Sequence, residues 1–121
     1  MSLLVAAYWR DPETGEIVQF VDWEGGHQIA GVERARYDLW GSEAVRRRGA
    51  RFLPQLAGSD LCVEPDDLDA FVTEVRGLLA DLDGLRAELG CGPDSLLSEY
   101  LDNFLRAAKY ARARGGGVII D

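Results

Sequence analysis

The stretch at residues 68–89, LDAFVTEVRGLLADLDGLRAEL, decides the fold. Its large apolar residues recur at alternating gaps of three and four positions. Because an α-helix has 3.6 residues per turn, this spacing places them on one stripe, which needs a partner to cover it. The stripe consists of Leu68, Phe71, Val75, Leu78, Leu82, Leu85 and Leu89. We therefore predict one amphipathic helix over residues 68–89, interrupted only by the poor helix formers Gly77 and Gly84.

A second amphipathic run follows after the four residues GCGP at 90–93. Gly90 is of the type that ends a helix in the left-handed conformation, and Pro93 suits the start of the next one. The new apolar stripe is Leu97, Leu101, Phe104, Ala108 and Ala111. Two helices with so short a connection predict an antiparallel hairpin. A coiled-coil arm for dimerisation is the alternative interpretation.

The remaining segments predict a small, mainly antiparallel sheet. Residues 2–9 and 16–23 are rich in β-forming side chains and flank a turn that contains Asp-Pro and Gly, which is typical of a hairpin. Short strands are expected at 60–64 and 117–120, with the last strand either beside 60–64 or at an edge. Residues 24–31 are expected to form a loop, and residues 32–37 either a third strand or the approach to a helix. A shorter helix is expected at 38–48, capped by Ser42 or Asp38.

These elements predict an α+β fold, in which the sheet is covered by the helix hairpin and the shorter helix. At 121 residues the chain is expected to form a single domain, 1–121. Its composition, 47% hydrophobic and 28% charged, is typical of a soluble protein. It has no apolar run of about 20 residues and no signal-peptide pattern, so we expect a cytoplasmic protein of bacterial type that does not enter a membrane.

The two cysteines lack the CxxC spacing of redox or zinc motifs. Free thiols are the simpler interpretation, and a disulfide between Cys62 and Cys91 is compatible with the sequence. Cys62 lies between two apolar residues of an expected strand, which predicts a buried and unreactive thiol. Cys91 lies in the connection between the helices, which predicts exposure.

Acidic residues concentrate in the middle of the chain. Residues 60–102 carry twelve acids but only Arg76 and Arg86 as bases, within a net charge of −8 for the whole chain. Such a field repels nucleic acid and attracts a basic protein. A solvated helix face that serves solubility is the alternative interpretation. Candidate partner-binding residues are Asp66, Asp67, Asp69, Glu74, Asp81, Glu88, Trp23 and His27.

Catalytic and metal-binding patterns are not evident in the sequence. His27 is the only histidine, so a zinc site lacks its usual ligands, and neither cysteine carries the signature of a cysteine enzyme. The triple glycine at 115–117 follows a helix and lacks the Lys of a phosphate-binding loop. The arginines at 46–48 and Arg51 form a basic patch that either is solvated or pairs within the molecule. We predict no catalytic residue, no metal ligand and no cofactor.

In size, acidity and the lack of a catalytic set, the chain resembles the small immunity proteins that bacteria make against their own secreted toxins. The resemblance concerns general character, and it identifies no individual residue. It implies a non-catalytic, inhibitor-type protein that presents an acidic helical surface to a basic protein partner. Two alternatives remain: a homo-oligomeric module, such as a homodimer formed through the helix hairpin or a sheet edge, and a small-ligand binder or enzyme that uses the loop from Gly25 to His27.

Overall fold

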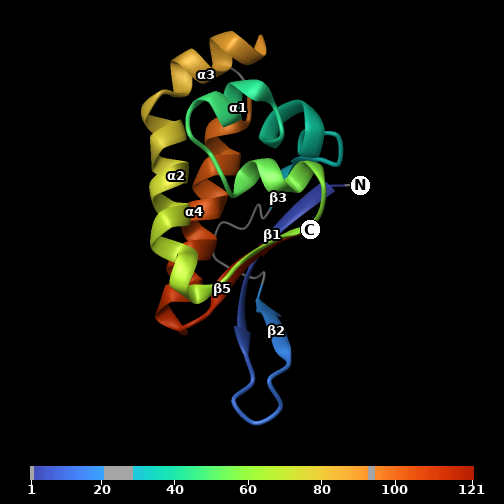
Figure 1. Cartoon of the computed structure of the whole chain (residues 1–121), viewed down its shortest axis with the longest axis vertical. Helices are drawn as coiled ribbons and strands as arrows, with labels where there is room; N and C mark the ends of the chain where they lie inside the picture. Colours follow the sequence, from blue (N-terminus) through green and yellow to red (C-terminus); the bar gives the residue numbers. More distant parts are fainter. Residues whose placement is uncertain (1, 21–28, 93–94) are drawn as a thin grey trace.

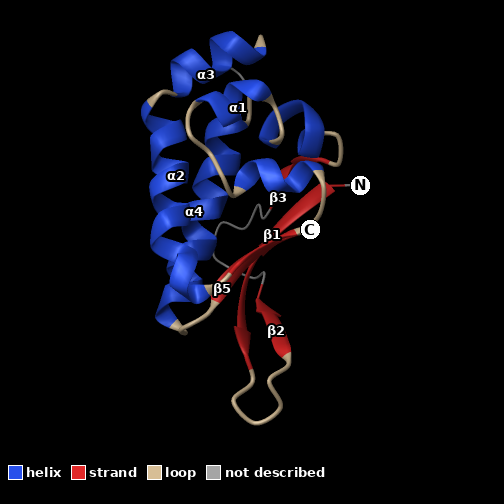
Figure 2. Cartoon of the chain, in the orientation of Figure 1, coloured by secondary structure: helices blue, strands red, loops and turns tan. Residues whose placement is uncertain are grey.

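The protein has an α+β fold in which a five-stranded antiparallel sheet carries all the described helices on one side (Figure 1, Figure 2). This computed structural model describes residues 2–20, 29–92 and 95–121. The fold class expected from the sequence is therefore confirmed. Both described ends of the chain lie on the same side of the molecule (Figure 1).

The sheet is built around the first and last strands of the chain. The strands are β1 (Ser2–Arg10), β2 (Ile17–Phe20), β3 (Ile29–Val32), β4 (Leu61–Val63) and β5 (Gly117–Ile120). Their order is β2-β1-β5-β4, and β3 pairs with the N-terminal half of β1. In register, Ile120 lies opposite both Val5 and Leu61. The last strand thus lies inside the sheet beside β4, and the edge alternative for this strand is wrong.

Alternation along the strands decides which side chains reach the core. Leu61 and Val63 in β4 are buried in it, whereas Cys62 between them is exposed on the opposite side. The expectation of a buried Cys62 is therefore wrong, because successive strand residues point to opposite faces and the apolar neighbours occupy the inner one. Cys62 and Cys91 are both free thiols in the structure.

Strand β3 corrects the loop expected at 24–31. Its residues Ile29 and Ala30 are held by long-range hydrogen bonds that the local sequence does not reveal. Asn103 Nδ2 donates to the Ile29 carbonyl at 2.8 Å, and Trp40 Nε1 donates to the Ala30 carbonyl at 2.8 Å. The third strand therefore begins at Ile29, three residues before the segment 32–37, for which the sequence allows a strand.

The predicted helix hairpin is present as α2 (Leu68–Ala80) and α4 (Leu97–Ala113), which run antiparallel beside each other (Figure 1). Both stripes face the core: Phe71 and Val75 from α2 are buried, as are Leu101 and Phe104 from α4. Gly90 ends the preceding helix in the left-handed conformation, with φ of 72°. The predicted helix end at Gly90 is therefore confirmed. The expected connection of only four residues is wrong for these two helices, because α2 already ends at Ala80 and α4 begins at Leu97.

The expected single helix over 68–89 is wrong in one respect, because it breaks at Asp81. After the break, α3 (Leu82–Leu89) turns away from α2 and crosses the end of the molecule above α1 (Glu43–Arg47) (Figure 1). Arg48 holds it there, with Nε 2.9 Å from Asp81 Oδ2 and Nη1 3.0 Å from Glu88 Oε1. Neither Gly77 nor Gly84 marks the break, and Asp81, which does, is one of the two carboxylates that pair with Arg48.

The shorter helix expected at 38–48 is divided into two pieces. A π-helical turn, η1 (Arg36–Trp40), is followed by α1, and Ser42 between them accepts a hydrogen bond from the Val45 N–H at 3.3 Å. Of the two caps expected, Ser42 is therefore the one observed. Two 3₁₀ turns complete the helical part, η2 (Leu53–Ala57) and η3 (Pro65–Asp67).

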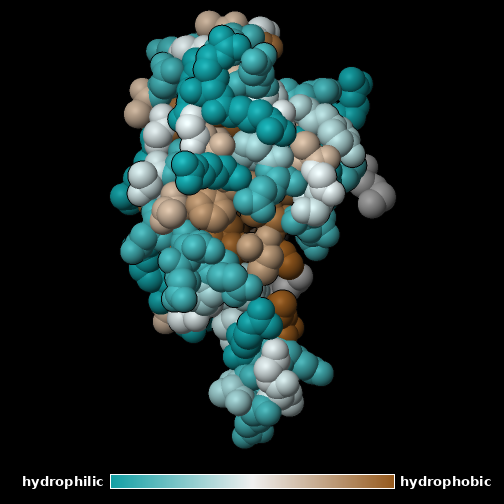
Figure 3. Space-filling model, in the orientation of Figure 1, coloured by the Kyte–Doolittle hydropathy of each residue, from teal (hydrophilic) through white to brown (hydrophobic). Residues whose placement is uncertain are grey.

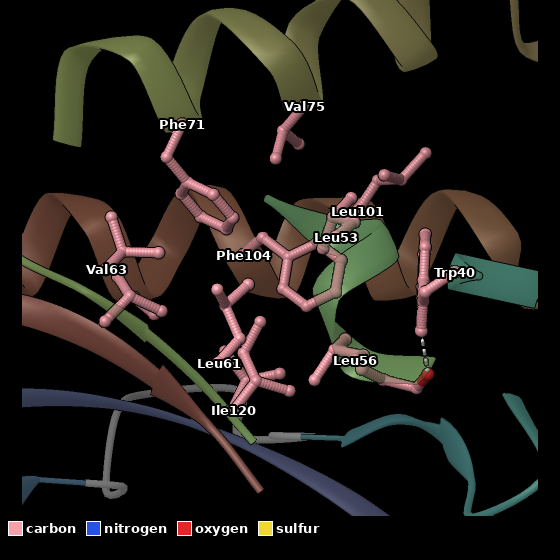
Figure 4. Packing of buried hydrophobic residues seen from close by; sticks show 14 of the residues in the cluster. Trp40, Leu53, Leu56, Leu61, Val63, Phe71, Val75, Leu101, Phe104 and Ile120 are labelled. Atoms are coloured by element: carbon pink, nitrogen blue, oxygen red, sulfur yellow. Dashed lines mark hydrogen bonds between the residues drawn. The ribbon is translucent and has the colours of Figure 1, made fainter. Parts of the chain in front are cut away.

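A row of three aromatic rings, from η1, α4 and α2, packs in the core between the helices and the sheet. Trp40 packs edge-on against Phe104 with ring centroids 5.0 Å apart, and Phe104 against Phe71 at 5.9 Å. Figure 4 shows this row between α2, α4 and the strands, with Leu61 and Ile120 below it. Edge-to-face contacts of this kind add about 1 kcal/mol each beyond the burial of apolar area.

The turn from α4 into β5 brings the backbone against β1 without room for a side chain. A Cβ atom at Gly116 would overlap the carbonyl oxygen of Tyr8. The predicted role of the triple glycine as the end of the helix is confirmed, since Gly115 has φ of 67°. Its middle residue has a further role, because glycine alone permits so close an approach between α4 and the centre of the sheet.

Hydrophilic residues cover most of the face in Figure 3, with a band of hydrophobic residues across its middle at the level of β5. Among the described residues, no helix combines the length and the apolar character needed to cross a bilayer.

Candidate protein-interaction site

Four of the six helix-borne acids proposed for partner binding have partners within the molecule. Asp69 pairs with Arg112 at 2.5 Å, and Asp81 and Glu88 hold Arg48. Glu74 accepts hydrogen bonds from three successive backbone N–H groups at the start of η2. All four carboxylates therefore have partners within the molecule. Asp69, Asp81 and Glu88 each pair with an arginine, although Asp69 does so at an open surface, where its side chain is 91% exposed.

Asp66 and Asp67 have a different position. Both lie in η3, where their side chains are exposed, and neither takes part in an ion pair with any described residue. They face solvent at the start of α2, where the helix dipole also favours negative charge. The other two candidates, Trp23 and His27, lie outside the described residues, as does the loop from Gly25 to His27.

The β1–β2 hairpin extends beyond the sheet at the same end of the molecule (Figure 1). β5 pairs with β1 only as far as Tyr8, whereas β1 continues through Arg10 and pairs there with Ile17 of β2. The tip of the hairpin is therefore free of the sheet and carries the turn at 11–16 away from the body.

This turn is closed by hydrogen bonds of its own. The Asp11 N–H donates to the Glu16 carbonyl at 2.8 Å, and the Gly15 N–H to the Asp11 carbonyl at 2.8 Å. Asp11 Oδ1 accepts from the Glu13 N–H at 2.8 Å. Gly15 adopts φ of 72°, which side-chain-bearing residues rarely adopt. The acidic side chains of Glu13 and Glu16 are exposed on a turn with a defined shape.

An ion pair joins the last residue of β1, just before the turn, to the acidic segment before α2. Arg10 Nη2 lies 3.5 Å from Glu64 Oε1, and Glu64 immediately precedes η3. The turn and η3 thus belong to one surface, which we call the acidic end. It consists of Asp11, Glu13, Glu16, Glu64, Asp66 and Asp67.

Three arginines lie near the acidic end, and each is already engaged. Arg10 pairs with Glu64, and Arg112 pairs with Asp69. The Arg114 guanidinium stacks on aromatic rings, 5.3 Å from the centre of Trp9 and 5.6 Å from that of Tyr110. A stacked guanidinium keeps its positive charge, but the six carboxylates of the acidic end together with Asp69 outnumber these three arginines, so the charge offered to a partner is negative.

Apolar side chains adjoin this charge. Ile17 is 43% exposed and Val18 is 40% exposed, and they follow the turn directly. Exposed β-branched residues beside an acidic turn offer an apolar contact next to polar groups, and protein interfaces likewise place an apolar core beside a polar rim.

Tyr8 is buried next to Glu64 of the acidic end. Its hydroxyl donates to Glu64 Oε2 at 3.0 Å and lies 3.3 Å from the Val63 carbonyl oxygen. Burial, supported by the neighbouring Cys62 thiol and Glu64 carboxylate, raises the pKa of Tyr8 above its ordinary value of 10.0. Tyr8 is therefore a neutral donor that positions Glu64, and it carries no charge at physiological pH.

Metal-binding geometry is not seen in the part of the chain that the structure describes, where no three His, Cys, Asp or Glu side chains gather around one point. The arginine patch pairs within the molecule through Arg47 and Arg48, which both contact Glu88. This outcome is one of the two that the sequence left open for the patch.

Sequence reasoning missed the hairpin acids Asp11, Glu13 and Glu16. Asp-Pro and Gly predict only a turn in this segment, although three acids within six residues between two strands already signal a charged hairpin tip. The link to Glu64 spans more than fifty positions and has no local signal.

The chain matches no protein-family model, no curated protein and no solved structure.

Proposed function

We propose that this protein is a non-catalytic binding protein of the inhibitor type, which inserts its acidic end into a basic site of another protein. The observation that carries the proposal is the acidic turn at 11–16, preorganised by its own hydrogen bonds and carried beyond the sheet. A turn that is already ordered loses little conformational entropy on binding, so more of the contact energy appears as affinity.

The position of the acids favours the hairpin over the helical surface that the sequence suggested. Asp69, Glu74, Asp81 and Glu88 are engaged within the molecule, whereas Glu13, Glu16, Asp66 and Asp67 face solvent. Uncompensated charge attracts a basic surface and accelerates its association. We therefore keep the expectation that the chain binds a basic protein, but we propose the acidic end as the binding surface in place of the helical surface.

The proposal predicts that charge reversal at the hairpin abolishes partner capture. The test variant is Glu13→Lys with Glu16→Lys. The matched control is Glu43→Lys with Asp83→Lys, which makes the same change in net charge on exposed residues of α1 and α3, at the other end of the molecule. Each tagged protein is incubated with an extract of the cells that produce it, and the retained proteins are quantified by mass spectrometry.

We expect wild type and control to retain the same basic protein, and the hairpin variant to lose it. With the purified partner, calorimetry should show that the dissociation constant rises about a hundredfold or more for the hairpin variant. Retention of an unchanged set of proteins by the hairpin variant would refute the proposal, as would a captured partner that is acidic.

A further inference from the structure

A groove between α2 and α4 is lined by basic residues, in contrast to the net negative charge of the chain. It has a volume of about 310 Å³ and is lined by Val72, Arg76, Leu105, Ala108, Lys109 and Arg112. Three of these residues are basic, in a chain with a net charge of −8. The groove therefore attracts a negatively charged occupant, unlike the acidic end.

The basic residues of the groove are not equally available. Arg112 pairs with Asp69, whereas Arg76 and Lys109 take part in no ion pair among the described residues. Val72 and Leu105 between them are only partly buried and supply an apolar floor. Two uncompensated cations above an apolar floor fit an occupant that carries acidic and apolar side chains together.

The β1–β2 hairpin of a second copy has this composition. Glu13 and Glu16 supply the acids, and the exposed Ile17 and Val18 supply the apolar side chains. A groove of 310 Å³ admits a few side chains and no folded body, so a narrow hairpin tip is a suitable occupant.

We propose that two copies of the chain associate by placing the hairpin tip of each in the α2–α4 groove of the other. Each copy supplies one hairpin tip and one groove. The dimer therefore contains two identical contacts related by a two-fold axis, and the assembly closes at two copies. Direct contact of groove with groove is disfavoured, because Arg76 and Lys109 would meet their own copies. The dimer uses the same hairpin as the proposed function, but the dimer can form whether or not the proposed function is correct. A basic partner would compete with the second copy for the hairpin tip.

The test exchanges the charges of the two surfaces. The groove variant is Arg76→Glu with Lys109→Glu, and the hairpin variant is again Glu13→Lys with Glu16→Lys. Sedimentation equilibrium of each protein alone and of their equimolar mixture reports the molecular mass. Circular dichroism confirms that each variant retains its helices, and the Glu43→Lys, Asp83→Lys protein has the same net charge as the hairpin variant.

We expect wild type and control to be dimers, and each variant alone to be a monomer because like charges then meet in both contacts. In the mixture, each hairpin finds a groove of opposite charge, so dimers should return. A wild type that remains a monomer at the highest soluble concentration overturns the inference, and so does a mixture that remains monomeric.

The groove variant separates this inference from the proposed function. Its hairpin is intact, so it should bind the captured basic partner with the affinity of wild type or higher. If the dimer fails while the partner still requires Glu13 and Glu16, the proposed function stands alone. If the charge exchange restores dimers while no basic partner is captured, the self-association stands alone.

Discussion

At the residue scale, one carboxylate organises a segment that lies far from it in sequence. The Glu74 carboxylate accepts from the N–H groups of Arg51, Phe52 and Leu53 at distances from 2.5 to 3.2 Å. These donors open the η2 turn, so Glu74 of α2 acts as the cap of another element. The sequence pattern predicts that Glu74 lies on the solvent-facing side of its helix. In the structure its carboxylate instead contacts the backbone N–H groups before and at the start of η2.

We predict that Glu74→Ala lowers the free energy of unfolding by about 3 kcal/mol, because it leaves three backbone donors without their charged acceptor. The control Asp102→Ala removes an exposed carboxylate from α4 and should change the free energy by no more than about 0.5 kcal/mol. Urea unfolding followed by circular dichroism measures both. Equal stability of the two variants would contradict the capping role of Glu74.

Tyr8 makes stability depend on alkaline pH. Its pKa is raised in the folded protein, whereas in the unfolded chain it titrates near 10.0. Above pH 10 the unfolded state loses a proton that the folded state keeps, so stability falls as pH rises, by about 1.4 kcal/mol per pH unit from this group. Tyr8→Phe should remove that part of the slope in urea unfolding between pH 9 and 11. An identical slope in both proteins would show that Tyr8 ionises normally in the fold.

At the element scale, the position of α3 depends on ion pairs with the segment after α1. Arg48 contacts Asp81 and Glu88 at the two ends of α3 and also donates to the Ala44 carbonyl at 2.9 Å. Its side chain is only 16% exposed, so solvent screens these contacts less than at an open surface. The helix break at Asp81 and the ion pairs with Arg48 are parts of one arrangement.

We predict that Arg48→Met loosens α3 while α2 and α4 remain as they are. Backbone amides at 82–89 should exchange with deuterium about tenfold faster, because local opening of α3 no longer breaks ion pairs. Arg51→Met is the matched control, since the Arg51 side chain is exposed. Exchange at 82–89 that is unchanged in the Arg48 variant would mean that apolar packing alone holds α3.

At the scale of the whole molecule, charge separates into an acidic end and a basic groove. For the proposed complex with a basic protein, raising NaCl from about 0.05 to 0.5 M should slow association about tenfold and change dissociation much less, because salt screens long-range attraction first. Stopped-flow fluorescence with the captured partner measures both rates, and the Asp66→Asn, Asp67→Asn protein should show a weaker salt dependence. A salt effect confined to dissociation would place the recognition in short-range contacts.

The sequence by itself determined the α+β class, the helix hairpin and four of the five strands. It did so because the helical stripe from Leu68 onward and the β-forming composition of residues 2–9 and 16–23 are local signals, which can be read without knowing what each element contacts. The same reasoning identified the glycine ends of the helices and the acidic character of the middle of the chain.

Only the tertiary structure decided which residues the faces of the helices and strands contact. The pairing of Arg48 with Glu88, the capping of η2 by Glu74, and the junction of Arg10 with Glu64 each join residues more than twenty positions apart. Periodicity contains no information on such partners, so the sequence could not distinguish a carboxylate that serves the fold from one that faces solvent. The acidic end arises in the same way, since its two halves meet only when β1 and β4 enter one sheet.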